Sequence, residues 1–443
     1  MNLENLKKTL FEGGIAGAGG AGFPTYAKLS DQADTVILNC AECEPLIKVD
    51  RQLIAQYVNE ILSGMQLLVE AMGAEKGIIA VKKSYTVALE TIRGCIGAYD
   101  KLMLHVLPDI YPAGDEVILI YETTGRIVPQ GKIPIMVGCV VVNVETVLNI
   151  SRKVNEDHNV TTKFVTVAGL VNSPVTVEVP IGITVEQLLS MAGGVSREDA
   201  VLLMGGPMTG RICSRGDVVT KTTKALLVLP PTCLPIAKRR RKTQYNIRNA
   251  MSVCSQCSMC TSLCPRNLIG HSIRPHEFMR ALANGLTSQT DAFLNSFFCC
   301  SCGLCEMYSC HQDLSPRSLL DAYKAGLRAK GVKIPDKKDR GTADPMRQER
   351  RVPEHRLLVR LGLEPYDIPA PLVKYQGKTD SVRLMLRQNI GAPCVPSVKT
   401  GDVVEEGMQI AAPPQGALGT CLHASIGGRV TAVTDSYITI QAE

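Results

Sequence analysis

Two runs of cysteine carry the clearest chemical signal in the sequence. The first run has the spacing C-x2-C-x2-C-x3-C followed by Pro265, and the second has the spacing C-x2-C-x2-C-x4-C. This spacing lets three thiolates wrap one iron–sulfur cube, while the fourth cysteine binds the neighbouring cube in two-cluster proteins. The sequence therefore predicts two [4Fe–4S] clusters. Their eight candidate ligands are Cys254, Cys257, Cys260, Cys264, Cys299, Cys302, Cys305 and Cys310.

The division of these thiolates between two clusters follows from the same spacing. The fourth cysteine of each run is predicted to bind the cluster of the other run, so Cys310 joins the first run and Cys264 joins the second. Zinc or purely structural cysteines are the alternative, but a structural zinc site uses four ligands in two pairs and these runs over-supply it, so we favour clusters. Cys300 stands beside Cys299 and could replace it as a ligand, although we favour Cys300 as a bystander.

A second chemical signal is the glycine-rich stretch from Gly17 to Gly22, which matches G-x-G-x-x-G. A dinucleotide-binding Rossmann unit requires a strand before this loop and a helix opening at it. Here a helix is expected before the loop and a strand after it, so we reject a Rossmann unit. Glycine still lets backbone amides approach a phosphate closely, and a flexible turn is the alternative.

Alternating helical and apolar segments surround this loop and predict an α/β layered domain over residues 1–158. Leu3, Leu6 and Leu10 have helical spacing and precede the glycines. The next expected elements are a strand at 35–39, a helix at 51–72, strands at 77–82 and 101–107, a helix after 116 and a strand at 135–143.

The rest of the chain divides by composition into four further segments. Residues 160–232 indicate a small mixed α+β module, and residues 245–330 hold the cysteine runs, with helices expected at 274–284 and 317–329. Residues 331–378 are expected to be a charged linker, since 330–352 are rich in charge, Gly and Pro. Residues 379–443 show short strands separated by Gly and Pro turns, as small β modules do.

The bulk composition excludes several classes of protein. The chain has 443 residues, 17 cysteines and a net charge of +6. It contains no uninterrupted apolar stretch of about 18 residues, so we expect no membrane span. The basic run from Lys238 to Lys242 is not interleaved with stacking aromatics, so we expect no nucleic-acid partner. The N-terminus lacks an apolar signal core, which predicts an unexported protein without a disulfide scaffold.

Four segments resemble, in the expected order, the FMN- and NADH-binding subunit of respiratory complex I and still more the RnfC electron-transfer subunit. They are GGAGFPTYAKL (19–29), VILNCAECEP (36–45), YPAGDEVILIYETTGR (111–126) and VVVNVETV (140–147). The resemblance implies a noncovalent FMN and NADH as electron donor. The cofactor-binding positions that it implies are Gly17, Gly19, Gly20, Gly22, Phe23, Lys28, Asn39, Glu42, Glu44, Gly114, Asp115, Glu116 and Asn143.

Within this set the resemblance implies three roles. The phosphate would lie near Gly17, Gly19, Gly20 and Asn143, and Phe23, Glu44 and Glu116 would lie near the nicotinamide nucleotide. Other flavin-contacting positions would be Lys28, Asn39, Glu42, Gly114 and Asp115. The sequence departs from the complex I pattern at Ala41 and Val142, and it lacks the aromatic expected after Lys28. These departures leave the FMN site intact and alter the nucleotide site.

Two smaller modules also show a resemblance. Residues 167–194 resemble an SLBB β-grasp module, and residues 390–411 with 422–430 resemble a lipoyl-like barrel-sandwich module. A lipoyl domain would present a Lys at its hairpin tip, where this sequence has Ala424, Ser425 and Ile426, so we predict no lipoylation. The expected fold is therefore multidomain α/β and α+β, with a helical two-cluster ferredoxin-like domain and a C-terminal β barrel-sandwich module.

The order of these modules resembles the flavin and iron–sulfur cobalamin reductases of propanediol-utilisation microcompartments. That resemblance implies an oxidoreductase that passes electrons from NADH through FMN and two [4Fe–4S] clusters to a corrinoid, in the cytoplasm and inside a bacterial microcompartment, with microcompartment proteins as partners. The alternative is an RnfC-like relay subunit or adaptor that delivers electrons to ferredoxin or another partner protein. Because the charged segment after the second cysteine run should be exposed, we expect electrons to leave at that run.

Overall fold

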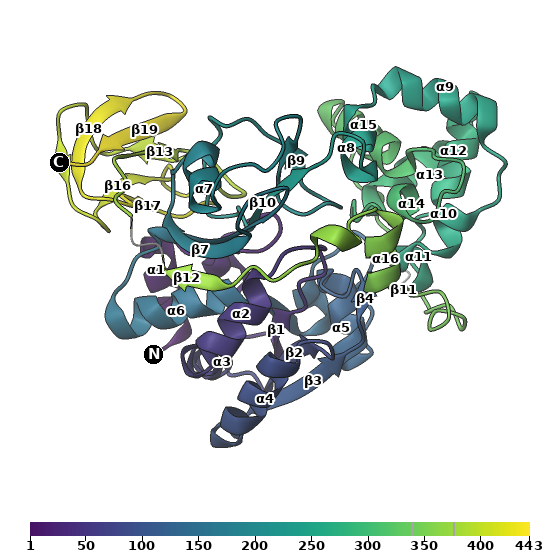
Figure 1. The fold of residues 1–443 in the computed structure, drawn as a ribbon. Coiled ribbons are helices and arrows are strands. Elements are labelled where there is room, and N and C mark those ends of the chain that lie inside the picture. Colours follow the sequence, from purple (N-terminus) through teal and green to yellow (C-terminus); the bar gives the residue numbers. More distant parts are fainter. Residues whose placement is uncertain (338–340, 375–376) are drawn as a thin grey trace.

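A parallel sheet with strand order β3-β2-β1-β5 forms the centre of the N-terminal domain, which lies at the bottom of Figure 1. The structure is a computed structural model that describes residues 1–337, 341–374 and 377–443. The sheet consists of β1 (Thr35–Cys40), β2 (Lys76–Lys82), β3 (Leu102–Leu107) and β5 (Cys139–Asn143). Helices of this domain are α1 (Leu3–Glu12), α2 (Val49–Gln56), α3 (Val58–Ala71), α4 (Thr86–Cys95), α5 (Glu116–Thr124) and α6 (Val144–Glu156).

Side chains of the central strand alternate between two apolar cores, as the twofold period of a strand requires. Val36 and Leu38 of β1 face a core that includes the helices α1, α2, α3 and α6. Ile37 faces a smaller core formed with α5. The predicted α/β layered domain is confirmed by this arrangement of helices on both faces of a parallel sheet.

Two expected elements of this domain differ from the structure. The helix expected at 51–72 is interrupted at Tyr57, whose φ of −117° and ψ of 34° end α2 and begin α3. The strand expected at 135–143 is shorter, because the 3-10 helix η3 (Pro134–Val137) ends at Gly138 in the left-handed region and only then does β5 begin.

The middle module is a mixed sheet with strand order β12-β7-β6-β10-β8-β9, in which β12 (Leu372–Lys374) comes from a later part of the chain. Its elements are β6 (Thr162–Gly169), β7 (Val175–Pro180), α7 (Val185–Met191), β8 (Val201–Met204), β9 (Arg211–Ile212) and β10 (Ala225–Leu229). In Figure 1 this teal module lies above the N-terminal domain and between the other two modules.

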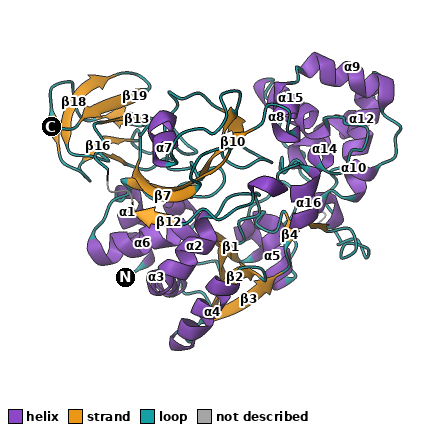
Figure 2. Cartoon of the chain, viewed as in Figure 1, coloured by secondary structure: helices purple, strands orange, loops and turns teal. Residues whose placement is uncertain are grey.

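The cysteine domain, residues 245–330, contains helices and loops, whereas the C-terminal module is built of strands (Figure 2). The helices expected at 274–284 and 317–329 are confirmed as α12 and α15. From the approach to this domain to its end, the helices are α8 (Leu234–Arg240), α9 (Thr243–Val253), α10 (Met259–Ser262), α11 (Pro265–Leu268), α12 (Pro275–Ala283), α13 (Thr290–Leu294), η4 (Asn295–Phe298), α14 (Leu304–Met307) and α15 (Pro316–Ala329).

The segment expected to be a linker contains secondary structure that packs against other modules, although many of its described residues are exposed. Residues 338–340 and 375–376 lie outside the described residues. It forms β11 (Val352–Pro353), α16 (Glu354–Arg360), η5 (Glu364–Tyr366) and β12 (Leu372–Lys374). Strand β11 pairs with β4 (Ile110–Tyr111), and β12 extends the sheet of the middle module. Its charges explain the difference from the prediction, because Glu354 and Asp367 pair with Lys82 and Lys48, two buried lysines of the N-terminal domain.

The C-terminal module, residues 379–443, contains two sheets with strand orders β13-β19-β18-β15 and β14-β16-β17. Its strands are β13 (Ser381–Met385), β14 (Val395–Pro396), β15 (Val403–Val404), β16 (Gln409–Ala412), β17 (Leu422–His423), β18 (Gly428–Val433) and β19 (Tyr437–Gln441). Lys221 of the middle module is buried against it and donates hydrogen bonds to the carbonyls of Gly14 and Cys421, both at 2.7 Å. This ammonium therefore connects three parts of the chain. Among the described residues, no helix is both long and apolar enough to cross a membrane.

Candidate functional site

A cavity of about 640 Å³ opens at the carboxyl ends of β1 and β5. The parallel register places Asn39 opposite Asn143, so both amide side chains reach the same edge of the sheet. Ligands of open α/β sheets bind at this edge, where loops leave the carboxyl ends of the strands. The cavity is lined by the glycine loop, by segments of the N-terminal domain, by Lys224 of the middle module and by Ile390 of the C-terminal module.

The glycine loop forms one wall of this cavity. Gly20 and Gly22 have φ values of +75° and +70°, a region that favours glycine. The loop is held from behind, because the amide of Gly17 donates to the Phe23 carbonyl at 2.9 Å and that of Ala18 to the Thr146 hydroxyl at 2.9 Å. The amides of the next three residues, 19–21, donate to no acceptor among the described residues. The loop therefore offers free donors to a phosphate, and an FMN phosphate fits it.

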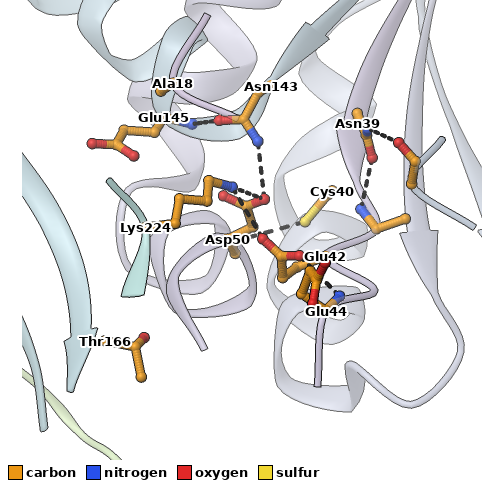
Figure 3. Close-up of polar contacts among 12 residues, drawn as sticks. Ala18, Asn39, Cys40, Glu42, Glu44, Asp50, Asn143, Glu145, Thr166 and Lys224 are labelled. Atoms are coloured by element: carbon orange, nitrogen blue, oxygen red, sulfur yellow. Dashed lines mark hydrogen bonds and ion pairs between the residues drawn. The ribbon is translucent and has the colours of Figure 1, made fainter. Parts of the chain in front are cut away.

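A charged network lies directly beside the glycine loop, because a β-carbon on Gly19 would be 3.2 Å from Asn143 Nδ2 and 3.5 Å from Lys224 Nζ. Figure 3 shows the side chains of this network. The ammonium of Lys224 lies 2.5 Å from Asp50 and 3.3 Å from Glu42, and the amide of Asn143 donates to the same Asp50 oxygen at 2.9 Å. Burial alone would lower the pKa of Lys224, but attraction by the two carboxylates outweighs burial and raises that pKa above its usual value. Lys224 is therefore a fixed cation beside the cavity.

One atom of this network is left for a ligand. The second carboxylate oxygen of Asp50 is buried and has no hydrogen-bond partner among the described residues. A buried carboxylate oxygen without a donor costs free energy, so a donor group on a bound molecule would stabilise it. The hydroxyl and ring N–H groups of FMN are donors of this kind, and the donor set of the cavity fits the cofactor.

Two further polar contacts fix the floor of the cavity. Lys28 Nζ lies 3.0 Å from Glu116 Oε1, and the Asn39 amide donates to the Gly114 carbonyl at 2.9 Å. Glu116 is the first residue of α5, so the helix itself is aimed at the cavity. A β-carbon on Gly114 would lie 2.4 Å from the Ala41 carbonyl oxygen, which shows how closely the two loops approach.

Most of the cofactor-binding positions predicted from the sequence line this cavity. They are Gly17, Gly19, Gly20, Gly22, Phe23, Lys28, Asn39, Glu42, Gly114, Glu116 and Asn143. Asp50, Lys224 and Ile390 also line it and were missed. Asp50 lies only a few residues beyond the Cys43–Pro45 motif, whereas Lys224 and Ile390 reach the cavity through tertiary contacts that no local pattern signals.

The structure places the two remaining predicted positions, Glu44 and Asp115, outside the cavity lining. Glu44 accepts hydrogen bonds from the amide of Met208 at 2.8 Å and the hydroxyl of Thr209 at 2.5 Å, so the middle module holds it. Burial raises the pKa of Glu44 to about 7, although these two hydrogen bonds oppose the rise. Asp115 caps the N-terminus of α5 and pairs with Arg266 at 2.9 Å.

The candidate cluster ligands surround two small cavities in the cysteine domain. One is lined by Cys254, Cys257, Cys260 and Cys310; the other is lined by Cys264, Cys299, Cys300, Cys302 and Cys305. The fourth cysteine of each run thus lies with the first three of the other run, the arrangement that two [4Fe–4S] clusters require. Cys299 and Cys300 both line the second cavity, so both remain candidates for the ligand at that position. Among the described residues, no three His, Cys, Asp or Glu side chains form a site for a single metal ion.

The two cysteine cavities differ in depth. The cavity of Cys302 lies against the N-terminal domain, because the Tyr111 hydroxyl donates to the Cys302 carbonyl at 2.6 Å and Arg266 in its wall pairs with Asp115. In the other cavity Cys257 is exposed to solvent. Three cysteines of the second run line the inner cavity, whereas its fourth, Cys310, lines the outer one. The expectation that electrons leave at the second run stays a prediction, and the exposure of Cys257 favours the outer cavity as the exit.

Comparison with known protein families agrees with this architecture. Residues 10–152 match the Nuo51 FMN-binding domain, residues 164–212 the SLBB domain, residues 253–315 the 4Fe-4S dicluster domain and residues 370–443 the RnfC barrel sandwich hybrid domain. The fold class predicted from the sequence is confirmed. The chain is a flavin and iron–sulfur electron-transfer protein with FMN and two [4Fe–4S] clusters as cofactors.

Full-length relatives define the family more closely. The chain is 40% identical over 443 residues to "Cobalamin reductase PduS" of Citrobacter freundii, covering 99% of this chain and 96% of the relative. It is 41% identical to the Salmonella typhimurium protein of the same name, covering 99% and 97%. A component of the Na⁺-translocating ferredoxin:NAD⁺ oxidoreductase complex of Acetobacterium woodii is 33% identical over 60% of this chain and 59% of that component. The chain belongs to the PduS cobalamin reductase family.

Proposed function

We propose that this chain is an NADH-dependent cobalamin reductase, which passes electrons through FMN and two [4Fe–4S] clusters to the cobalt of a corrinoid. The observation that carries the proposal is the continuous link from the flavin cavity to the inner cysteine cavity. Glu116 lines the first, Asp115 precedes it in the chain, and Asp115 pairs with Arg266 in the wall of the second. Bound FMN would supply the exchange between a two-electron hydride and single electrons, which the clusters then carry.

The residues of the chain would hold these groups in a fixed order. The amides of the glycine loop would bind the FMN phosphate, and Lys224 would place a positive charge beside it. Asp50, Asn39 and Asn143 would orient the rest of the cofactor through their polar atoms. The inner set would hold the cluster nearer the flavin, and the outer set would hold the second. The inner set is Cys264, Cys299, Cys302 and Cys305, and the outer set is Cys254, Cys257, Cys260 and Cys310.

The test is a sequence of absorption spectra of the anaerobically reconstituted protein. We expect bound FMN and two clusters, loss of their visible absorption on addition of NADH, and then conversion of added cob(III)alamin to reduced corrinoid. A protein that NADH reduces, but that leaves the corrinoid oxidised while reducing a ferredoxin, would contradict the corrinoid assignment.

A second candidate function is an electron relay or adaptor without its own NADH site. One observation favours it: Glu44, expected near the nicotinamide nucleotide, is held by Met208 and Thr209. An NADH diaphorase assay with a small artificial acceptor separates the two functions. Absence of NADH oxidation by flavin-loaded protein would contradict the reductase and support the relay.

We further propose a location inside a bacterial microcompartment, with microcompartment proteins as partners. Resemblance to the cobalamin reductases of propanediol utilisation supports this proposal. The chain should copurify with intact shells from cells grown to form them. Its recovery entirely in the shell-free fraction would contradict the proposal.

A further inference from the structure

Exposed side chains of α9 and of the loop after it form a surface that adjoins, along the chain, the ligands of the outer cysteine cavity. We call this surface the outer cysteine face and define it by Arg248, Met251, Val253, Cys257 and Met259, all of which are exposed. Met251 is 60% exposed, Val253 42% and Met259 39%. Arg248 and Met251 are three residues apart in α9 and therefore share one side of that helix. Helix α9 lies at the outer end of the cysteine domain in Figure 1.

The chain around this face is strongly basic. Residues 218–276 contain no Asp or Glu. The same stretch contains ten basic residues, namely Lys221, Lys224, Lys238, Arg239, Arg240, Arg241, Lys242, Arg248, Arg266 and Arg274. Lys221, Lys224 and Arg266 are occupied by contacts inside the protein. Arg240, Lys242 and Arg248 are exposed.

Nearby acidic groups do not cancel this charge. Asp313, which follows the outer ligand Cys310, lies 2.9 Å from Lys238 and also pairs with Arg241. Glu277 of α12 pairs with Arg274 at 3.0 Å. Because these acidic groups are already paired, the exposed side chains of Arg240, Lys242 and Arg248 give the outer cysteine face and its border a net positive charge.

The size of the outer cavity excludes direct entry of a large acceptor. It is about 30 Å³, a volume that a corrinoid ring cannot enter, and the cluster held by its four cysteines would fill it. An electron from this cluster must therefore cross the surface to an acceptor docked outside. Apolar side chains at the centre of a charged rim are typical of interfaces between proteins, and complementary charge raises the rate at which such partners meet.

We propose that the outer cysteine face is the docking site for an acidic protein that carries the corrinoid. This proposal rests on the proposed function and adds to it the point of electron exit and the chemistry of the partner. Met251, Val253 and Met259 would form the apolar centre of the contact, and Arg240, Lys242 and Arg248 would attract the acidic surface of the partner.

The experiment uses stopped-flow mixing of the full-length, reconstituted protein, reduced with dithionite and freed of excess reductant. Two probes are an acidic plant-type [2Fe–2S] ferredoxin and the basic protein cytochrome c, at a series of salt concentrations. The variants are Arg248→Glu and Met251→Ser. The matched control is Arg93→Glu, an exposed arginine on α4 of the N-terminal domain.

We expect Arg248→Glu to slow reduction of the acidic ferredoxin by about tenfold and to weaken its salt dependence, since steering contributes factors of 10 or more. Met251→Ser should slow the same reaction without changing its salt dependence. Arg93→Glu should reduce the ferredoxin at a rate within about twofold of that of the unaltered protein. The Arg248→Glu protein should reduce cytochrome c at least as fast as the unaltered protein does.

An equal loss in Arg93→Glu, or no loss in Arg248→Glu, would overturn the docking site. Because the protein is reduced chemically, these outcomes do not depend on NADH or on the final acceptor. Failure of the proposed function would appear separately, as absence of NADH oxidation or of corrinoid reduction.

Discussion

The guanidinium of Arg266 lies 2.9 Å from the carboxylate of Asp115, and this pair joins the cysteine domain to the N-terminal domain. Arg266 follows Cys264 by two residues, while Asp115 caps the helix whose first residue lines the flavin cavity. Burial alone would raise the pKa of Asp115, but Arg266 outweighs burial and holds that pKa below its usual value. The pair therefore fixes the two cofactor sites relative to each other.

Replacing Asp115 with Asn should reduce the free energy of unfolding by about 3 kcal/mol, because it leaves the buried Arg266 charge unpaired. Since the pKa of Asp115 is depressed in the folded state, its stabilisation is present above the unfolded pKa and is lost as the pH falls through the folded value. Urea unfolding between pH 3 and 7 measures both effects. The control is Glu277→Gln, which removes a partly exposed pair and should cost under about 1 kcal/mol. Equal losses in the two variants would show that the buried pair has no special role.

Replacing Gly20 with Val should abolish FMN binding and leave the iron content unchanged. Gly20 lines the cavity, and a β-carbon there would meet no protein atom within 4 Å, so the added side chain should clash with the bound phosphate and not with the protein. Gly20 has φ +75°, which adds backbone strain, and Gly73 is the matched control because its φ is +67° and its surroundings are also open. Gly73→Val lies outside the cavity and should keep its flavin. Flavin absorbance after gel filtration decides the matter, and yellow Gly20→Val protein would place the phosphate elsewhere.

Replacing Lys224 with Met should weaken FMN binding at least about tenfold, equivalent to about 1.4 kcal/mol. The substitution removes the cation and leaves Asp50 and Glu42 as negative charges facing the FMN phosphate. Lys224→Arg keeps the charge and should recover part of the affinity. Quenching of flavin fluorescence during titration of the flavin-free protein measures the dissociation constants. Unchanged affinity in Lys224→Met would remove Lys224 from the flavin site.

Replacing Glu44 with Gln should flatten the dependence of stability on pH. The folded pKa of Glu44 is raised to about 7, so the folded state holds a proton that the unfolded state releases above its own, ordinary pKa. Stability therefore falls as the pH rises from about 4.5 through 7, and Gln, which cannot ionise, should not show this part of the loss. Thermal unfolding of both proteins at pH 5 and pH 8 gives the comparison. A parallel loss in the variant would assign the pH dependence to other groups.

Replacing Cys257 with Ala should reduce the iron content from about eight to about four atoms per chain, since one cube loses a ligand. Cys300→Ala should keep both clusters, because Cys299 lies in the same cavity wall. Iron analysis of the reconstituted variants and their visible spectra provide the measurement. Loss of a cluster in Cys300→Ala would transfer the ligand role from Cys299 to Cys300.

Local patterns in the sequence identified the parts of the site that are close together along the chain. The alternation of Val36, Ile37 and Leu38 between two cores follows from the period of a strand, and the cysteine spacing anticipated the exchange of Cys264 and Cys310 between cavities. The order of the two cavities relative to the flavin could not be predicted. It depends on tertiary contacts such as that between Tyr111 and Cys302, which lie far apart in the sequence.

The segment expected to be a linker shows that a charge-rich composition does not by itself identify a linker. Glu354 and Asp367 lie in a stretch whose composition is typical of a solvated linker. Their partners are nevertheless Lys82 and Lys48, which are almost completely buried in the N-terminal domain. A buried lysine requires a counter-charge, and here the counter-charge comes from more than 250 positions further along the chain. The same difficulty hid Lys224, whose position beside Asp50 is set by the docking of the middle module.

The contribution of the C-terminal module to the flavin cavity has a consequence for how the protein is made. Ile390 lines the cavity, and its amide donates to the Gly22 carbonyl of the glycine loop at 3.0 Å. During translation the glycine loop leaves the ribosome first and Ile390 follows hundreds of residues later, while the N-terminal domain already begins to fold. The cavity is therefore complete only after Ile390 has been synthesised and docked, and a truncated chain that ends before residue 379 would have the loop but not the closed site. Stable enclosure of the cofactor thus requires that the C-terminal module has docked on the glycine loop.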